Sequence, residues 1–342
     1  MNMKASDSIK SHYTVCIVIL VCIVFCGCQG EPVSHTMVST CIIKEKTIAD
    51  DIIQIKEMKY LVSVVEELHL SKSYDGCTWT EIPHPCTIRP HYVYSPALFK
   101  TPQDQLGLVW SEKSLGRPQI SSLYMSIYEA EIWSAPRLLF QREEICHVRD
   151  AVMLVDGALL ILWDEPYYIP QPSLGPNTIG TGCDLIYRAW VINDDEIIER
   201  IFEPENLTFC IMKGLGFIVE DGTIWCAFYQ ENEDVQLYRS KSRDGKKWDP
   251  PELIESTIHG DQIILTPQGE IGIVDHDYYE KRVYLYTSVN WKTWRKEIIF
   301  ESDDLIAGII ITQGESDTLW GIIDSGSDVF LIESIPVSQM KS

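Results

Sequence analysis

The chain has few basic residues, no metal-type cysteine spacing and no extended helical pattern. Its 342 residues include 28 Lys and Arg against 50 Asp and Glu, a net charge of −22. Nucleic acid and anionic lipid surfaces are therefore unfavourable partners, because like charges repel. None of the eleven cysteines has C-x-x-C spacing, so we expect no metal site, and we predict no cofactor. Beyond the leader, no segment combines a sustained helical period with capping residues, which disfavours a helical fold.

The N-terminus has the pattern of an export signal. Lys4 and Lys10 precede an apolar run at 13–27, which is shorter than the roughly 20 residues that cross a bilayer as a helix. The run ends in Phe25-Cys26-Gly27-Cys28, which resembles a lipobox with Phe in place of the usual Leu. We expect residues 1–28 to form a leader helix, either cleaved with lipidation at Cys28 or retained as a membrane anchor. The remainder is then exported to the extracellular face of the membrane.

Seven cysteines follow the leader, so at least one is unpaired within the chain. The spacing allows a bridge between Cys77 and Cys86 and another between Cys210 and Cys226. Buried free thiols are the alternative.

A nine-residue stretch occurs twice, as SKSYDGCTW at 71–79 and SKSRDGKKW at 240–248, with a related SVNWKTW at 288–294. Each follows two apolar stretches rich in β-formers and separated by a turn, such as Asp-Gly, that supplies the positive φ of a hairpin. A third strand leads into the stretch, and a fourth follows its Trp. Four antiparallel strands repeated every ~50 residues indicate a propeller blade.

This repeat predicts an all-β fold, a single six-bladed β-propeller over 38–337 built from four-stranded antiparallel blades. The last blade has only three strands in sequence. We expect its outer strand to come from 38–44, which closes the ring and leaves no free edge. The predicted blades span 45–86, 87–143, 144–204, 205–256, 257–302 and 303–337.

The repeated turn resembles the Asp box, also called the BNR repeat, of sialidase-like β-propellers, with its glycine one place early. In such a turn the Asp accepts backbone N–H groups and the Trp packs between blades, so its role is structural. The resemblance assigns that role to Ser73, Asp75, Trp79, Ser242, Asp244, Trp248, Ser288, Asn290 and Trp294.

Strand connectivity places the starts of the inner strands and the loops between second and third strands on one face. Propellers commonly bind ligand there. The predicted catalytic residues are Asp150, Asp261 and Arg149, which lie at inner-strand starts. The predicted ligand-binding residues are Arg89, His147, Asp164, Glu165, Tyr168, Asp277 and Tyr278. His276 is interpreted as a solvated loop residue.

Paired carboxylates near aromatic rings suit glycoside hydrolysis, which needs one acid and one base or nucleophile. The sequence therefore predicts a monomer that acts on cell-surface or extracellular glycans. The family resemblance also implies an R-I-P motif, three substrate-clamping arginines and a Tyr nucleophile. Here Ile88-Arg89-Pro90 scrambles that motif, and the last blade has no Tyr. A non-catalytic scaffold that binds glycan or protein at the same face is the alternative.

Overall fold

The computed structural model describes residues 37–43, 49–64, 68–86, 93–114, 120–142, 147–170, 179–193, 196–198, 211–231, 235–255, 258–277, 279–314, 318–325 and 329–334. Every regular element in these ranges is a β-strand, and they belong to a compact unit, Ser34–Ser342. The predicted leader helix and Cys28 lie outside them. Within the same ranges, no helix is long and apolar enough to cross a membrane.

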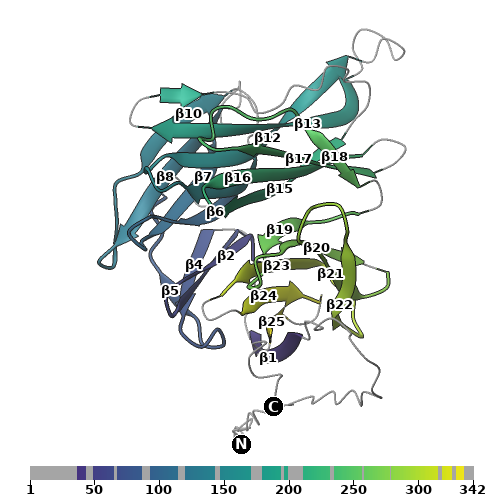
Figure 1. The fold of residues 1–342 in the computed structure, drawn as a ribbon. Coiled ribbons are helices and arrows are strands. Elements are labelled where there is room, and N and C mark those ends of the chain that lie inside the picture. The colour runs from purple at the N-terminus through teal and green to yellow at the C-terminus, as the bar shows by residue number, and fades with distance from the viewer. Residues whose placement is uncertain are drawn as a thin grey trace, which may run out of the picture. The chain divides into compact units, whose positions relative to one another are not determined.

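The first three sheets follow one another along the chain (Figure 1). The first contains β2 (Asp51–Ile55), β3 (Met58–Val64), β4 (Leu68–Ser73) and β5 (Thr80–Ile82). The second contains β6 (Val93–Lys100), β7 (Leu106–Lys113), β8 (Ser121–Glu129), β9 (Ile132–Trp133) and β10 (Arg137–Arg142). The third contains β11 (His147–Met153), β12 (Leu159–Pro170), β13 (Ile179–Asn193) and β14 (Glu196–Ile198).

Three further sheets complete the arrangement. The fourth contains β15 (Ile211–Glu220), β16 (Thr223–Glu231), β17 (Val235–Ser242) and β18 (Glu252–Glu255). The fifth contains β19 (Gln262–Leu265), β20 (Ile271–Asp277), β21 (Arg282–Ser288) and β22 (Arg295–Glu301). The sixth contains β23 (Gly308–Gln313), β24 (Leu319–Asp324), β25 (Val329–Ser334) and β1 (Met37–Ile43).

These sheets form a β-propeller, as predicted. Five sheets have the four strands that the repeat predicts, but the second has five, because the short β9 also pairs with β8. The sixth sheet takes its outer strand from the N-terminal end, where Met37–Ile43 pairs with Val329–Ser334, as expected. The first strands of neighbouring sheets contact one another in the series β2, β6, β11, β15, β19 and β23, and β23 contacts β2.

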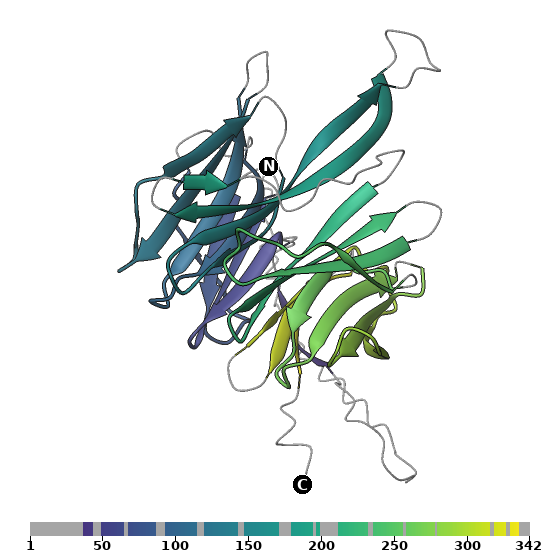
Figure 2. The ribbon, with the colours of Figure 1, turned by 45° about the horizontal axis from the view of Figure 1, so that its top comes forward.

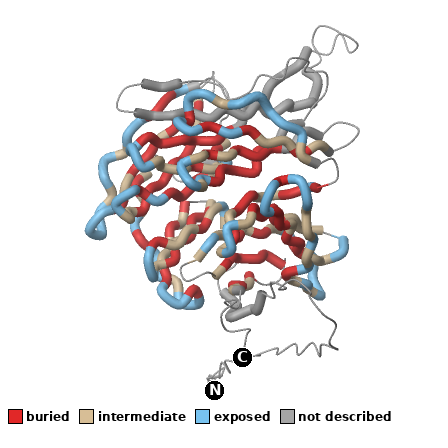
Figure 3. Tube along the Cα trace, viewed as in Figure 1, coloured by how far each residue is buried: buried red, intermediate tan, exposed pale blue. Residues whose placement is uncertain are grey.

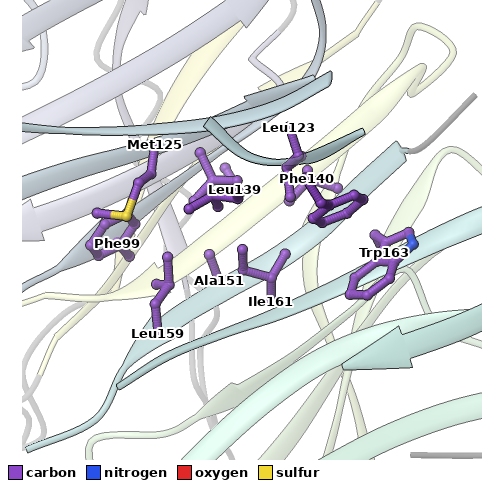
Figure 4. Close-up of a cluster of buried hydrophobic side chains, with 12 residues drawn as sticks. Phe99, Leu123, Met125, Leu139, Phe140, Ala151, Leu159, Ile161 and Trp163 are labelled. Carbon is purple, nitrogen blue, oxygen red and sulfur yellow. The ribbon is translucent and has the colours of Figure 1, made fainter. Parts of the chain in front are cut away.

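The hydrophobic core lies between neighbouring sheets, where the inner and middle strands are buried (Figure 3). One cluster joins the second and third sheets (Figure 4): Phe140 of β10 packs against Trp163 of β12, with ring centroids 5.2 Å apart. The strands alternate Val, Ile and Leu between both faces because each face meets another sheet. Burial of these faces, at roughly 25 cal/mol per Å² of apolar area, drives the ring together.

The Asp-box turns are built by side-chain oxygens that accept backbone N–H groups. Asp75 Oδ1 accepts from Cys77 at 2.8 Å and Thr78 at 2.7 Å. The same two contacts are made by Asp244 Oδ1, to Lys246 and Lys247, and by Asn290 Oδ1, to Lys292 and Thr293. The hydroxyls of Ser73 and Ser242 accept the N–H of the box glycine.

Each box tryptophan packs in a hydrophobic cluster shared by two sheets. Trp79 packs with residues of the first and sixth sheets, Trp248 with the third and fourth, and Trp294 with the fourth and fifth. The turn therefore fixes both the end of its own blade and the contact with a neighbour.

Two predictions about local structure are wrong. Asp164, Glu165 and Tyr168 lie within β12, and Asp277 is the last residue of β20, so none of them is in a loop. β12 and β13 continue as a two-stranded ribbon beyond the part of the sheet that β11 covers (Figure 2). A long ladder replaces the expected loop because both segments keep a strand conformation.

The cysteines do not pair in either of the ways that the spacing allows. Cys77 is disulfide-bonded, whereas Cys86 and Cys226 are free thiols. This excludes both the Cys77–Cys86 bridge and the Cys210–Cys226 bridge.

Candidate functional site

Two inner-strand carboxyls tie neighbouring sheets together. Asp150 of β11 accepts the N–H of Ala151 at 2.8 Å, and it accepts the N–H of Phe217, on β15 of the fourth sheet, at 2.6 Å. Asp51 of β2 does the same, accepting from Ile52 at 2.8 Å and from Leu98, on β6 of the second sheet, at 2.6 Å. One oxygen of each carboxyl therefore binds its own strand, and the other binds the next sheet.

A third acceptor completes the pattern. Gln262 of β19 accepts the N–H of Ile311, on β23 of the sixth sheet, with Oε1 at 2.9 Å. The three clasp residues, Asp51, Asp150 and Gln262, thus join sheet one to two, three to four and five to six. Because Gln262 carries no charge, the clasp needs a carbonyl-type acceptor rather than an acid.

The backbone that receives the Asp150 clasp is irregular. The register of β15 against β16 shifts between Gly214 and Gly216, just before Phe217. Gly216 has φ of +123°, and a Cβ there would lie 2.7 Å from Asp150 Oδ2. The glycine is therefore required both by its conformation and by the close approach of the carboxyl.

The two clasp carboxyls have different acidities. Burial raises the pKa of Asp51 to about 8, and repulsion from Asp150 adds to that rise. Burial raises the pKa of Asp150 to about 6, opposed by its backbone hydrogen bonds. At pH 7 Asp51 is mostly protonated and Asp150 is mostly ionised. A pair of carboxyls whose pKa values are separated in this way is typical of an acid and its partner base.

A second group of titratable side chains lies on the fifth sheet. Asp261, just before β19, places Oδ2 2.5 Å from Nδ1 of His276 in β20. Their side chains are 27% and 23% exposed. Burial and the charge of Asp261 raise the pKa of Asp275, while His259, His276 and Lys296 oppose that rise. The interpretation of His276 as a solvated loop residue is therefore wrong, because it is a half-buried strand residue bonded to a carboxylate.

The other predicted site residues are dispersed. Nδ1 of His147 lies 3.0 Å from Ser95 Oγ of β6, and Arg149 is exposed on β11. Asp277 Oδ1 accepts the N–H groups of Tyr279 and Glu280, each at 2.8 Å, and so closes the turn after β20. Arg89 and Tyr278 lie outside the described residues. Among the residues whose placement is given, no group of three or more His, Cys, Asp or Glu could hold a metal ion.

The contacts pair the two predicted catalytic carboxyls with other partners. Asp150 interacts with Asp51, and Asp261 interacts with His276. Sequence reasoning missed Asp51, Gln262 and His276. The signal for Asp51 was present, because it begins an inner strand, as does the position next to Asp261. For Gln262 and His276 no residue pattern marks the partner that the fold supplies.

No family model matches the chain, and no curated protein matches its sequence. Solved structures match its fold. The chain shares 13% identity with a Penicillium chrysogenum α-L-arabinanase complexed with arabinobiose, over 90% of this chain and 99% of that one, with a TM-score of 0.60. It shares 12% identity with a Trypanosoma rangeli sialidase bound to the inhibitor DANA, over 90% of this chain, with a TM-score of 0.58.

An α-L-arabinofuranosidase from Fusarium graminearum, in complex with an iminosugar inhibitor, is 11% identical over 92% of this chain and 100% of that one, with a TM-score of 0.57. The chain spans only 56% of the length of the sialidase. At these identities the similarity defines the fold alone. The chain has the fold of the sialidase-like β-propellers.

Proposed function

We propose that the chain is an exported, six-bladed propeller that acts on glycans and hydrolyses glycosidic bonds with inner-strand carboxyls. The observation that carries this proposal is the interaction between Asp51 and Asp150, whose pKa values are about 8 and about 6. Several propellers of the same fold are glycosidases whose structures hold arabinobiose or sugar-like inhibitors.

The two carboxyls suit complementary roles. Glycoside hydrolysis needs one protonated carboxyl to protonate the leaving oxygen and one ionised carboxyl to act as base or nucleophile. At neutral pH, Asp51 has the protonation state of the first and Asp150 that of the second. A carboxylate offers about four acceptor positions, so the two backbone N–H groups that each one binds do not exhaust its capacity.

The remaining predicted residues serve the ligand in this proposal. Asp261 and Arg149 stay assigned to the same face, because both lie at the start of an inner strand. The proposed ligand contacts remain Arg89, His147, Asp164, Glu165, Tyr168, Asp277 and Tyr278. A neutral glycan suits a chain of net charge −22 better than an anionic one.

A non-catalytic scaffold is the second candidate, and the clasp geometry favours it. Both oxygens of Asp51 and Asp150 bind backbone N–H groups, and uncharged Gln262 makes the third clasp. In this alternative the carboxyls hold sheets together, and the same face binds glycan or protein without turnover.

Isosteric amides separate the two candidates, because Gln262 shows that an amide oxygen can make a clasp. Wild type, Asp51→Asn and Asp150→Asn are assayed against chromogenic glycosides and labelled arabinan oligosaccharides, with melting temperature as the control for folding. Hydrolysis is expected in the wild type, with kcat reduced about 100-fold or more in either variant. Unchanged hydrolysis in both folded variants rejects the assignment of these carboxyls. Saturable binding without hydrolysis selects the scaffold.

Export and tethering at the extracellular face, with the propeller acting as a monomer, are part of the same proposal. The disulfide at Cys77 supports export, because disulfides persist in oxidising compartments. Fractionation of cells that express the full chain tests it. Membrane association that survives Cys28→Ser argues against the lipid anchor, and recovery in the cytosol argues against export.

A further inference from the structure

We propose that the fifth sheet carries a carbohydrate-binding subsite in which His276, oriented by Asp261, accepts a hydrogen bond from a sugar hydroxyl and Tyr279 stacks on the sugar ring. The subsite rests on the proposed function, in that its ligand is a glycan. It does not involve the clasp carboxyls, and nothing in it requires bond cleavage.

The position of Asp261 fixes the imidazole. The N–H of Asp261 donates to the carbonyl of Val274 at 2.8 Å, so its backbone is tied to β20. Its Oδ2 lies 2.5 Å from Nδ1 of His276, two residues further along β20. A carboxylate can only accept in this contact, so Nδ1 donates. When the imidazole is neutral, the lone pair is then on Nε2, which becomes a hydrogen-bond acceptor of fixed direction.

The turn that follows β20 presents an aromatic ring on a fixed backbone. Tyr279 is 89% exposed, the highest exposure of any described aromatic residue. Its N–H and that of Glu280 are held by Asp277 Oδ1, and the hydroxyl of Tyr284 donates to the carboxylate of Glu280. The N–H of Lys281 also donates to the carbonyl of Asp277 at 2.9 Å. A ring carried on such a pinned turn loses little conformational entropy on binding.

The two groups lie at one end of one sheet. β20 ends at Asp277 and the turn follows directly, so His276 and Tyr279 are three residues apart at the end of the sheet where β19 begins. A directional acceptor beside an exposed aromatic ring matches a sugar, which has hydroxyl donors on its edge and C–H groups on its faces. The adjacent carboxyls Asp261, Asp275 and Asp277 make a neutral sugar the expected ligand class.

The first measurement is NMR of ¹⁵N-labelled imidazoles in the full-length protein. We expect His276 to be the Nδ1–H tautomer at neutral pH, and we expect Asp261→Asn to abolish that preference. His276 resonances should also shift when neutral oligosaccharides, namely arabinobiose, xylotriose and cellotriose, are added in turn. The same tautomer in both proteins, or no shift with any of the three sugars, overturns the proposal.

The second measurement compares two exposed tyrosines by calorimetric titration with whichever sugar shifts His276. Tyr279→Ala is expected to weaken binding about tenfold and Tyr279→Phe to leave it nearly unchanged, since the ring supplies the stacking. The matched control is Tyr74→Ala, because Tyr74 is 73% exposed but lies in an Asp-box turn at the other end of its sheet. Equal effects at Tyr74 and Tyr279 reject the subsite. Binding retained in an Asp150→Asn protein that does not hydrolyse, and lost in Tyr279→Ala, separates this subsite from the hydrolytic proposal.

Discussion

Asp75 in an Asp-box turn and Asp51 in a clasp both accept two backbone N–H groups, yet their pKa values move in opposite directions. Hydrogen bonds from Thr78 and Cys77 lower the pKa of exposed Asp75 to about 2. Burial raises the pKa of Asp51 to about 8 although it binds two backbone N–H groups. The comparison shows that removal from water, rather than the number of donors, decides which carboxyl can titrate near neutral pH.

Each set of three also contains one uncharged member. Asn290 takes the Asp position in the third box, and Gln262 takes the acceptor position in the third clasp. Both make the backbone contacts through an amide oxygen. The fold therefore requires an acceptor at these places, whereas the acid is additional. In the boxes that acid is exposed and fully ionised, and in the clasps it is available for proton transfer.

The largest expected difference between the two regions is in the pH dependence of stability. The raised pKa of Asp51 means that its contribution is complete below about 3.8 and is lost as pH rises through about 8. For Asp75 the sign is opposite, and its contribution is present above 3.8 and lost as pH falls through about 2. Between pH 5 and pH 8 the wild type should lose on the order of 3 kcal/mol of unfolding free energy through Asp51.

Urea unfolding at pH 5 and pH 8 measures this difference. Asp51→Asn should reduce the loss between the two pH values, while Asp75→Asn should leave it as in the wild type. A loss of the same size in wild type and Asp51→Asn would show that Asp51 does not titrate in this range.

Removal of the acceptor should separate the regions next. Asp150→Ala leaves the N–H of Phe217 without its partner between two sheets, at an expected cost of about 3 kcal/mol. Asp244→Ala exposes its turn amides to water, so about 1 kcal/mol is expected. Asp150→Asn and Asp244→Asn are the matched controls and should each cost less than their Ala variants. Equal costs for the two Ala variants in urea unfolding contradict the distinction between buried and exposed acceptors.

The smallest expected effect tests the backbone under the clasp. Gly216→Ala combines a positive φ with a Cβ 2.7 Å from Asp150 Oδ2, whereas Gly157 has φ of +86° and nothing within 4 Å of its Cβ position. Gly157→Ala is expected to cost about 1 kcal/mol for backbone strain alone, and Gly216→Ala about 2 kcal/mol. Thermal unfolding of both variants compares them. A cost at Gly216 no larger than that at Gly157 would mean that the carboxyl moves aside without loss.

The repeated Asp boxes made the fold predictable. Ser73, Asp75 and Trp79 recur as Ser242, Asp244 and Trp248, and each turn is closed by residues two or three positions away, so a local pattern suffices. The closing strand β1 was predictable because the last blade has only three strands in sequence. The extent of β12 and β13 was not, because prolines at 166 and 170 indicate a loop, yet both segments pair as strands.

The sequence by itself determined the blade: strand, hairpin turn, strand, box and strand, with contacts between residues near one another in the chain. Only the tertiary structure decided which carboxyls are buried and what they meet. Asp51 and Leu98 are 47 residues apart, and Asp150 and Phe217 are 67 apart. Their pKa values depend on desolvation between sheets, a property of the assembled ring that no short stretch of sequence encodes.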